Sequence, residues 1–437
     1  MSVKELKENV CDGIEARSKD IIKVGETIWK RPELGYKEFE TSKYVRKKFD
    51  ELGLDYEADV AITGLVAKLS KKPKRPTIAV YGELDAIICP MHPNADPVTG
   101  AAHACGHNGQ IATMLGVGMG FVDTGILKDL TGNITLMAVP AEEYLEIEYR
   151  LGLKEQGKIQ FLGGKQEFIR LGKFNDVDIT LNTHIRAPMP ERKVEFSKSL
   201  NGFIGKSIRY IGKESHAGAA PDKGINALNA ALLGIMGIHA QRETFKEEDT
   251  IRIHPIITKG GDMVNNVPAD VKIETYVRGK TIEAIMDASK KVNRALRAGA
   301  MAIGAEVEIT EIPGYMPSIN DAQLTDLMKK NAIHLLGEEN IKEDEHRTGS
   351  SDVGDISCIM PSSGVNVGGV SGNGHSRDLK IVDPYMTYVV PAKIIAMTIV
   401  DLLSNNAAKA KEILSSFKPR IPRESYMDYW NKLLTDT

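Results

Sequence analysis

Three short apolar runs, each followed at once by charged or imidazole side chains, limit what this chain can fold into more than any other feature. The runs cover residues 77–81, 134–139 and 178–181. Short apolar runs of this kind are typical of parallel strands that are buried on both faces of a sheet. Because open α/β sheets collect their functional groups where the strands end, we expect the polar residues after these runs to share one crevice. These polar residues are Glu83, Asp85, Glu142, Glu143 and His184.

A different order of elements follows between residues 202 and 310. We expect a strand at 206–211, a helix at 225–241, two strands around 250–257 and 271–277, a helix at 282–300 and a strand at 306–310. This βαββαβ order is the split ferredoxin-like arrangement, and about a hundred residues is enough for a separate domain. After it, the strand-and-loop pattern of the first half resumes. The expected fold class is therefore α/β, with a mainly parallel sheet in one domain and an α+β ferredoxin-like domain inserted into it.

The length of 437 residues also favours two domains, because one ordinary hydrophobic core does not grow to that size. We place the discontinuous α/β domain at residues 1–197 and 314–437, and the inserted domain at 198–313. Residues 4–52 are expected to form two helices around a turn, and a last helix is expected at 391–403, before a polar tail.

The charge balance excludes several classes of protein. The chain has 56 lysines and arginines against 59 aspartates and glutamates, and its formal net charge is -3. We therefore expect no nucleic-acid partner and no polybasic contact with a membrane. We expect that no apolar run approaches the length needed to span a bilayer, and the charged N-terminus does not resemble a signal peptide. The four cysteines are scattered, which is typical of a reducing compartment, so we expect a cytoplasmic protein without disulfides.

The densest group of metal-ligating side chains is His103-Ala104-Cys105-Gly106-His107. A cysteine thiolate and a neutral imidazole are good ligands for borderline divalent metals. The spacing of Cys105 and His107 lets both side chains reach one ion from a turn but not from a regular helix. Taken alone the motif is weak evidence, since a free cysteine is more often a small buried hydrophobic residue. Residues 110–119 predict a buried helix that starts at this motif.

Further candidates elsewhere in the chain favour a metal site. Glu142 and Glu143 are adjacent, so one carboxylate could bind a metal while the other holds a water. His184 follows an apolar run, and His375 lies in the segment Gly-Asn-Gly-His-Ser. Each has an ordinary alternative, because an acidic pair is most often solvent-facing and a lone histidine after a strand is usually a hydrogen-bonded loop residue. Two other candidates, which we interpret as loop residues, are Cys89 and His92.

Together these motifs make the chain similar to the M20 metallopeptidase/amidohydrolase family over nearly its whole length. The resemblance rests on motifs that occur here in the family order. They are Gly82–Ala86, His103–His107, Ala141–Glu143, Ser215–Gly218, Gly260–Pro268, Arg278 and Gly374–Ser376. Within the family, Cys105–Asn108, Glu83 and Ser350–Asp355 resemble the aminobenzoyl-glutamate hydrolase B-subunit branch.

The resemblance implies a centre with one or two divalent metal ions, for which Zn, Mn, Co and Ni are all suitable. Cys105 would occupy the position expected to bridge two ions. Glu142 would be the general base, and Asp85 would orient His107 through its other ring nitrogen. The implied metal ligands are Cys105, His107, Glu143, His184 and His375.

The resemblance also implies roles for the inserted domain. This domain would be a lid and a dimerisation domain, so the protein would be a homodimer. His216 would act on the scissile carbonyl, either in its own subunit or in the partner subunit. Asn265 and Arg278 would bind a carboxylate of the substrate, and arginine is the side chain best suited to grip a carboxylate with two hydrogen bonds.

The expected activity is hydrolysis of the amide bond of an N-acyl or N-aroyl amino acid of the aminobenzoyl-glutamate type, by a metal-activated water and Glu142. The chain has no Gly-X-Ser-X-Gly motif, so we expect no covalent intermediate. Two alternatives are a dipeptidase or aromatic amine hydrolase on the same scaffold, and a catalytically inactive binding homologue. The presence of Glu142 together with all the ligand candidates argues against the inactive homologue.

Overall fold

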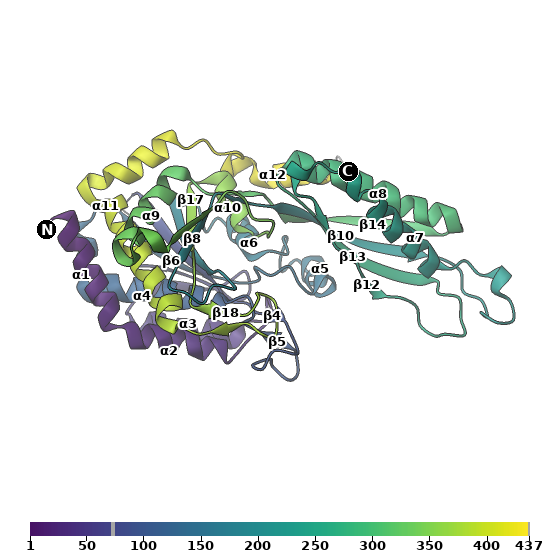
Figure 1. The fold of residues 1–437 in the computed structure, drawn as a ribbon, viewed down its shortest axis with the longest axis horizontal. Coiled ribbons are helices and arrows are strands. Elements are labelled where there is room, and N and C mark those ends of the chain that lie inside the picture. Colours follow the sequence, from purple (N-terminus) through teal and green to yellow (C-terminus); the bar gives the residue numbers. More distant parts are fainter. Residues whose placement is uncertain (71–74, 436–437) are drawn as a thin grey trace. The chain divides into compact units, whose positions relative to one another are not determined.

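The computed structural model describes residues 1–70 and 75–435, which divide into two compact units (Figure 1). Residues 347–354 and 423–435 group with the second unit, although we expected them in the α/β domain. Unit 1 comprises Met1–Ser199, Ile319–His346 and Asp355–Pro422, and unit 2 comprises Leu200–Ser318, Arg347–Gly354 and Arg423–Thr437.

Unit 1 contains a mixed sheet of eight strands. In spatial order they are β1 (Asp55–Val60), β2 (Gly64–Lys68), β6 (Asn133–Val139), β3 (Thr77–Glu83), β7 (Ile179–Ile185), β17 (Ser362–Val367), β8 (Val194–Ser197) and β16 (Ile341–Asp344). β6, β3, β7 and β17 are parallel neighbours, whereas β2 and β8 pair antiparallel with β6 and β17. Every residue of β3 and β6 is buried. The prediction of adjacent, buried parallel strands from the three apolar runs is confirmed.

The helices of this part of the chain are α1 (Val3–Ala16), α2 (Ser18–Trp29), α3 (Phe39–Glu51), α4 (His107–Thr124), α5 (Ile147–Glu155), α6 (Gly164–Arg170), α9 (Ala322–Leu336), α10 (Val353–Ile359) and α11 (Val390–Ser416). The central helix is α4, which contacts β3, α1, α2 and α11. Glycines allow this close packing, because a Cβ at Gly116 would lie 2.9 Å from Ile21, and one at Gly120 would lie 2.5 Å from Ile14. The first residue of α4 is thereby held against the ends of the parallel strands.

Three helices, and not the expected two, form the N-terminal part of unit 1. α1 and α2 are separated at Arg17, whose φ of -97° and ψ of 7° interrupt the helix. The Arg17 side chain donates to both Asp20 and Asp123, which holds the interruption in place. The apolar periodicity runs through this position, so the sequence pattern alone does not reveal the break.

The chain after residue 403, which we expected to be a polar tail, is also helical and packs into the core. α11 continues to Ser416 across four residues with non-helical backbone angles. Ala407, Ala410 and Ile413 are buried in the core of unit 1. Their spacing of three residues forms an apolar stripe within an otherwise polar segment, which explains why the segment packs as a helix.

The segment Tyr385–Ser416 is long and apolar enough to cross a membrane by length and composition alone. This finding corrects the expectation that no run approaches that length. However, 89% of its most apolar window is buried inside the protein, and α11 contacts α1, α4 and α9. The core helix of a globular domain has the same properties, so the segment is weak evidence for a membrane span.

Unit 2 has the expected βαββαβ order. Its elements are β10 (Gly202–Ile211), α7 (Ala227–Ala240), β11 (Arg252–Ile253), β12 (Ile256–Lys259), β13 (Asp270–Gly279), α8 (Ile282–Ile303), β14 (Glu306–Tyr315) and α12 (Tyr426–Thr435). The antiparallel sheet has the order β11-β13-β10-β14, and β12 also pairs with β13. The second expected strand is divided into β11 and β12 at His254 and Pro255, because proline cannot donate to a strand ladder.

Short strand pairs support the loops near the ends of the parallel strands. β4 (Ile87–Ile88) pairs with β5 (Ala101–Ala102), and β18 (Val370–Ser371) pairs with β19 (Lys380–Ile381). The loop between β18 and β19 contains His375. The remaining short strands are β9 (Ser199–Leu200) and β15 (Ser318–Ile319).

Candidate metal centre

The five expected metal ligands lie in unit 1, in loops and element ends at the carboxyl edge of the parallel strands. His107 is the first residue of α4, and Cys105 lies in the turn before it. Glu143 follows β6, and His184 is the last residue but one of β7. His375 lies in the loop that joins β18 and β19. Segments far apart in the sequence therefore supply one group of side chains.

A left-handed turn at Gly106 brings together Cys105 and His107, the two ligands on either side of it in the sequence. Gly106 has a φ of 88°, and a Cβ at this position would lie 2.5 Å from the side chain of Ile185. Both facts require glycine, because other residues are strained at positive φ and a side chain has no room here. The backbone N–H of His375 donates to the carbonyl of Ala104 at 2.8 Å, which ties the β18–β19 loop to this turn.

The donor atoms form two groups that share the thiol of Cys105. One group contains His107 and His184, and the other contains Glu143 and His375. Within each group the donor atoms lie within 4.8 Å of one another. Cys105 Sγ is 3.4 Å from His184 Nε2, and Glu143 Oε1 is 3.2 Å from His375 Nε2. Each distance is short enough for the two residues to bind the same ion. Metal–ligand bonds of about 2.0–2.3 Å keep two ligands of one metal less than about 4.6 Å apart.

Two of the imidazole rings are oriented by bonds to their Nδ1 atoms. His107 Nδ1 lies 3.0 Å from the carbonyl oxygen of Asp85 and 3.2 Å from Asp85 Oδ1, and His184 Nδ1 lies 2.8 Å from the carbonyl oxygen of Ile185. A carbonyl oxygen only accepts, so each Nδ1 donates and each Nε2 is the ligand atom. His107 Nε2 is buried, meets the geometry of no hydrogen bond to the described residues, and has the Glu83 Oε2 carboxylate oxygen 3.0 Å away. A nitrogen that binds a cation has this environment.

The charges in the two groups also favour a bound cation. Burial and the Glu143 carboxylate act to raise the pKa of Cys105, but His107 and His184 outweigh them and lower that pKa to about 6. The Glu143 carboxylate, followed by the Cys105 thiol, raises the pKa of His375 to about 11. Thiolate and carboxylate thus hold protons on the neighbouring imidazoles, and a divalent cation would displace those protons. The donor set and its charge therefore fit a divalent metal.

Glu142 lies beside these groups but belongs to neither of them. Glu142 is 7% exposed, and its Oε2 is 3.8 Å from His107 Nε2. The donor atoms of Glu142, Glu83 and His107 form a third group, within 4.8 Å of one another, whereas the donor atom of Glu143 groups with Cys105. The two adjacent carboxylates therefore occupy different positions around the centre.

A buried ion pair beside the centre was not expected from the sequence. Lys165 Nζ is 2.5 Å from Glu83 Oε1, and both side chains are at most 2% exposed. Gln110 Nε2 donates to Glu83 Oε2 at 2.6 Å, and the same oxygen is 3.0 Å from His107 Nε2. Burial acts to raise the pKa of Glu83, but Lys165 and then His107 keep it below its ordinary value. The sequence indicated Glu83 as a site residue, because it follows an apolar run. No comparable sequence pattern indicates Lys165.

His216 lies in unit 2 and is exposed. It forms a β-bridge with Asn266, and its Nδ1 accepts hydrogen bonds from the backbone N–H groups of Gly218 and Ala219 at 3.1 and 3.0 Å. Because Nδ1 accepts, the ring proton of the neutral imidazole lies on Nε2. The exposed His216 ring can therefore donate a hydrogen bond to a ligand.

Asn265 and Arg278 also lie in unit 2. Asn265 is exposed, and its carbonyl oxygen accepts from the N–H of Ala217 at 2.9 Å. Arg278 is on β13, and its guanidinium carbon lies 5.7 Å from the ring centre of Phe203 and 5.6 Å from that of Tyr276. Contact with aromatic rings restricts the guanidinium plane, which suits it to a planar carboxylate.

Three other histidine and cysteine candidates lie outside the two donor groups. His103 is 1% exposed, burial lowers its pKa to about 3, and neither ring nitrogen bonds to another described residue. His92 is bonded through its ring to the carbonyl of Leu379 and the N–H of Asn94. Cys89 lies in the same loop region as His92 and is partly exposed. Both are loop residues, as we interpreted them.

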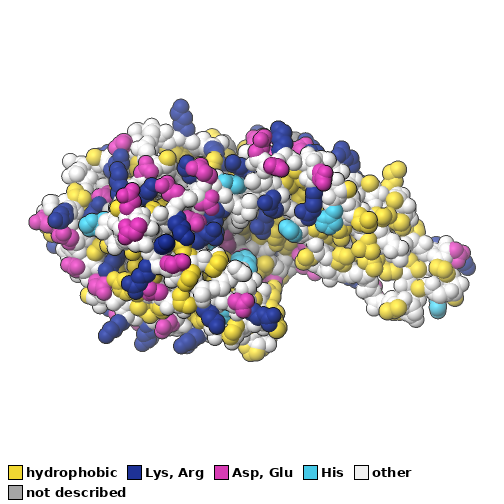
Figure 2. All heavy atoms as spheres, in the orientation of Figure 1, with side chains coloured by type: hydrophobic (Ala, Val, Ile, Leu, Met, Phe, Trp, Pro, Cys, Tyr) yellow, Lys and Arg dark blue, Asp and Glu magenta, His cyan; other side chains and the backbone are white. Residues whose placement is uncertain are grey.

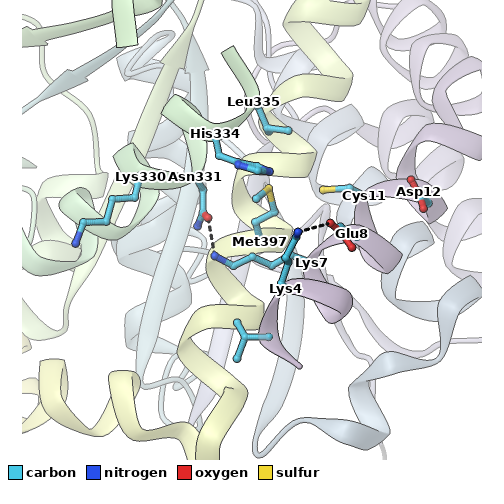
Figure 3. Close-up of a pocket in the computed structure, with 11 residues that line it drawn as sticks. Lys4, Lys7, Glu8, Cys11, Asp12, Lys330, Asn331, His334, Leu335 and Met397 are labelled. Atoms are coloured by element: carbon cyan, nitrogen blue, oxygen red, sulfur yellow. Dashed lines mark hydrogen bonds and ion pairs between the residues drawn. The ribbon is translucent and has the colours of Figure 1, made fainter. Parts of the chain in front are cut away.

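A cavity of about 810 Å³ lies elsewhere in unit 1, between α1, α9 and α11 (Figure 3). Lys7 donates to Asn331 at 2.9 Å and lies 2.6 Å from Asp401, while Lys4 is 3.8 Å from Glu8. These two lysines are thus paired with groups of the protein. The residues that line this cavity include none of the five expected metal ligands. We therefore do not connect it with the metal centre.

Known proteins share this sequence pattern. The family model described as peptidase family M20/M25/M40 matches residues 79–397. Over 376 residues the chain is 27% identical to the Xaa-Arg dipeptidase of Mus musculus, and the alignment covers 82% of this chain and 78% of that protein. The match extends through most of both chains.

Solved structures share the fold. The YXEP protein of Bacillus subtilis, described as a dinuclear metal binding peptidase from the M20 family, has a TM-score of 0.65 at 22% identity, covering 89% of this chain and 99% of that one. The aminobenzoyl-glutamate utilization protein from Klebsiella pneumoniae has a TM-score of 0.69 at 18% identity, covering 90% and 98%. At these identities the likeness shows the fold alone.

Proposed function

The chain belongs to peptidase family M20/M25/M40, and from this membership we propose that it hydrolyses the amide bond of an N-acyl or N-aroyl amino acid with the help of divalent metal ions. Its similarity to the family makes it a hydrolase. The observation that carries the proposal is a buried carboxylate, Glu142, beside two donor groups that share Cys105. Hydrolysis of an amide by water requires a base for the water and a means to polarise the carbonyl.

Cys105 would hold the metal ions together with His107 and His184 in one donor group and with Glu143 and His375 in the other. The two overlapping donor groups support this assignment, and so does the description of the B. subtilis structure as a dinuclear metal binding peptidase. When bound, the ions would lower the pKa of a water and polarise the substrate carbonyl. Thiolate, imidazole and carboxylate together suit Zn, Mn, Co or Ni.

The side chains of the protein would handle the protons and the geometry. Glu142 takes a proton from the attacking water and returns it to the leaving amine. Asp85 positions two ligands, because it contacts His107 Nδ1 and its Oδ2 accepts the backbone N–H of Glu143 at 2.8 Å.

The proposed substrate carries a free carboxylate, as aminobenzoyl-glutamate does. Arg278 and Asn265 would bind this group, and the contacts of Arg278 with two aromatic rings support its role. The resemblance of Cys105–Asn108 and Ser350–Asp355 to the aminobenzoyl-glutamate hydrolase branch supports an aroyl group. A second candidate function is dipeptide hydrolysis, which is favoured by the 27% identity to Xaa-Arg dipeptidase.

The purified protein loaded with Zn, Mn, Co or Ni is expected to hydrolyse N-acyl or N-aroyl amino acids in a panel that also contains dipeptides and anilides. A chelator is expected to abolish turnover and to lower Tm, because the clustered donor groups lose the cation that stabilises the folded state. Metal analysis, product assays and thermal melts measure these effects. Faster cleavage of Xaa-Arg dipeptides would favour the second candidate, and no turnover of any compound with any of the four metals would reject both.

We also propose that the protein is a cytoplasmic homodimer formed through unit 2. Leu232, Leu233 and Met236 on α7 are 45%, 39% and 65% exposed, and hydrophobic side chains gather on this part of the surface in Figure 2. Ile256 on the edge strand β12 is 59% exposed. An exposed apolar helix face and an open strand edge are typical of protein contacts. The free cysteines support a reducing compartment.

Replacing His216 by alanine is expected to lower kcat by about 10²–10³-fold and to raise KM less, because a donor to the oxyanion acts mainly as charge develops. The ring proton on Nε2 provides that donor. Steady-state kinetics with an N-acyl amino acid measure the effect, and His334→Ala, an exposed histidine of unit 1, is the matched control. An equal effect of both variants would reject the role.

Mixing the inactive His216→Ala and Glu142→Gln proteins tests whether His216 acts on the partner subunit. If it does, some heterodimers contain one complete site and part of the activity returns. If no activity returns although subunit exchange is verified, His216 does not act across the dimer.

A further inference from the structure

We propose that Glu38 is a positioning residue, which sets the places of Glu142 and Glu143 by holding the backbone of Ala141 in a strained conformation. The inference rests on the proposed function, because it concerns the geometry of the proposed base and its neighbouring ligand. Glu38 precedes α3 and is separated from Ala141 by 103 positions in the sequence.

Ala141, directly before the acidic pair, has a φ of 54°. This left-handed region is unfavourable for residues with a Cβ, and alanine lacks the side-chain bonds that let asparagine or aspartate adopt it. Ala141 is also completely buried. A strained residue of this kind persists only where its surroundings hold it, and such residues cluster at functional sites.

The backbone N–H and the carbonyl of Ala141 both form hydrogen bonds. Glu38 Oε1 accepts the Ala141 N–H at 2.8 Å, and Glu38 Oε2 accepts the hydroxyl of Thr63 at 2.6 Å. The Ala141 carbonyl accepts the N–H of Gly164 at 3.2 Å and lies 3.5 Å from Arg150 Nη1. Glu38 and Arg150 are both 0% exposed, so water does not compete for these bonds.

A second buried carboxylate, that of Asp85, accepts a hydrogen bond from the backbone two residues after Ala141. Asp85 Oδ2 accepts the N–H of Glu143, so Glu38 and Asp85 hold alternate N–H groups of the segment Ala141-Glu142-Glu143. Asp85 also contacts His107, and its loss would disturb a metal ligand directly. The Glu38 carboxylate instead accepts hydrogen bonds from the Ala141 N–H and the Thr63 hydroxyl, neither of which belongs to a proposed ligand. Changing Glu38 therefore tests the backbone geometry while every proposed ligand stays in the chain.

The position of Glu38 requires a hydrogen-bond acceptor and does not require a negative charge. Burial, and next the nearby Asp85, raise the pKa of Glu38. A neutral acceptor of the same shape can therefore make the bond to Ala141, and Glu38→Gln is expected to keep kcat within about threefold of wild type. Glu38→Ala removes the acceptor and is expected to lower kcat about 100-fold, with KM and metal content unchanged, because small misplacements of catalytic groups have effects of this size.

Thr63→Val is the matched control, because it removes the other bond of the same carboxylate and leaves the bond to Ala141. Its kcat is expected to stay near wild type. If Glu38→Ala does not fold, Glu38→Leu fills the same space without an acceptor and takes its place. A kcat near wild type in a folded Glu38→Ala or Glu38→Leu protein would overturn the proposal, and so would an equal loss in Thr63→Val.

Rescue by glycine separates positioning from a merely structural role. Adding Ala141→Gly to Glu38→Ala is expected to restore kcat about tenfold, because glycine adopts positive φ without being held. No recovery in a folded, metal-loaded double variant would overturn the proposal. Recovery of Tm without recovery of kcat would do so as well, since it would assign Glu38 to stability alone.

Amide hydrogen exchange at Ala141 keeps this test separate from the proposed function. Exchange of this N–H is expected to be faster in Glu38→Ala than in wild type and unchanged in Thr63→Val. If the wild-type protein hydrolyses no amide, the proposed function fails, while the exchange rates still show whether Glu38 holds this backbone. Unchanged exchange in Glu38→Ala would overturn the positioning proposal even if the enzyme is an active amidohydrolase.

Discussion

Replacement of Glu142 by glutamine is expected to lower kcat by about 10²–10⁴-fold while metal content and Tm stay unchanged. Glutamine keeps the shape of the side chain but cannot take a proton from water. Glu142 lies in a third group with Glu83 and His107 but in neither of the groups that share Cys105, so we expect the five proposed ligands to keep the metal ions bound. Steady-state kinetics and metal analysis of the same preparation measure both quantities.

Glu148→Gln is the matched control for this change, because Glu148 is close in sequence, exposed, and on α5. It should behave as wild type. Activity close to wild type in Glu142→Gln would reject the role as a base. Loss of metal from Glu142→Gln would instead identify Glu142 as a ligand.

Cys105→Ala is expected to lose metal and to have no measurable turnover. Cys105 is the one expected ligand that the two donor groups have in common, so its removal is expected to weaken metal binding in both groups. Loss of a group that only supports a ligand already costs about 10–100-fold in metal affinity, and loss of a shared ligand is expected to cost more. Metal stoichiometry after dialysis and kcat of the metal-loaded protein measure the effect.

Cys89→Ala provides the comparison, since Cys89 is a partly exposed loop thiol outside both groups. It is expected to keep its metal and its activity. An unchanged metal content in Cys105→Ala would reject the ligand role of that thiol. Equal losses in both variants would point to damage by thiol removal in general.

Much of the fold follows from local patterns. The strands β3, β6 and β7 were predictable, because a run of apolar residues that is buried on both faces has few other uses in an α/β protein. The break at Arg17 was not predictable, because Asp123, which helps to hold it, lies 106 positions away. The apolar stripe of Ala407, Ala410 and Ile413 was present in the sequence, but its polar neighbours concealed it.

The same distinction applies to the site. Residue type alone identifies side chains such as Cys105 and His107 as able to bind a metal, because donor chemistry belongs to the side chain and their spacing is local. Which buried charges meet depends on the folded chain: Lys165 reaches Glu83 across 82 positions, and Glu38 reaches Ala141 across 103. No local pattern encodes such contacts, because they arise from the packing of helices and strands that are distant in sequence. The backbone held at Ala141 is therefore a property of the three-dimensional structure.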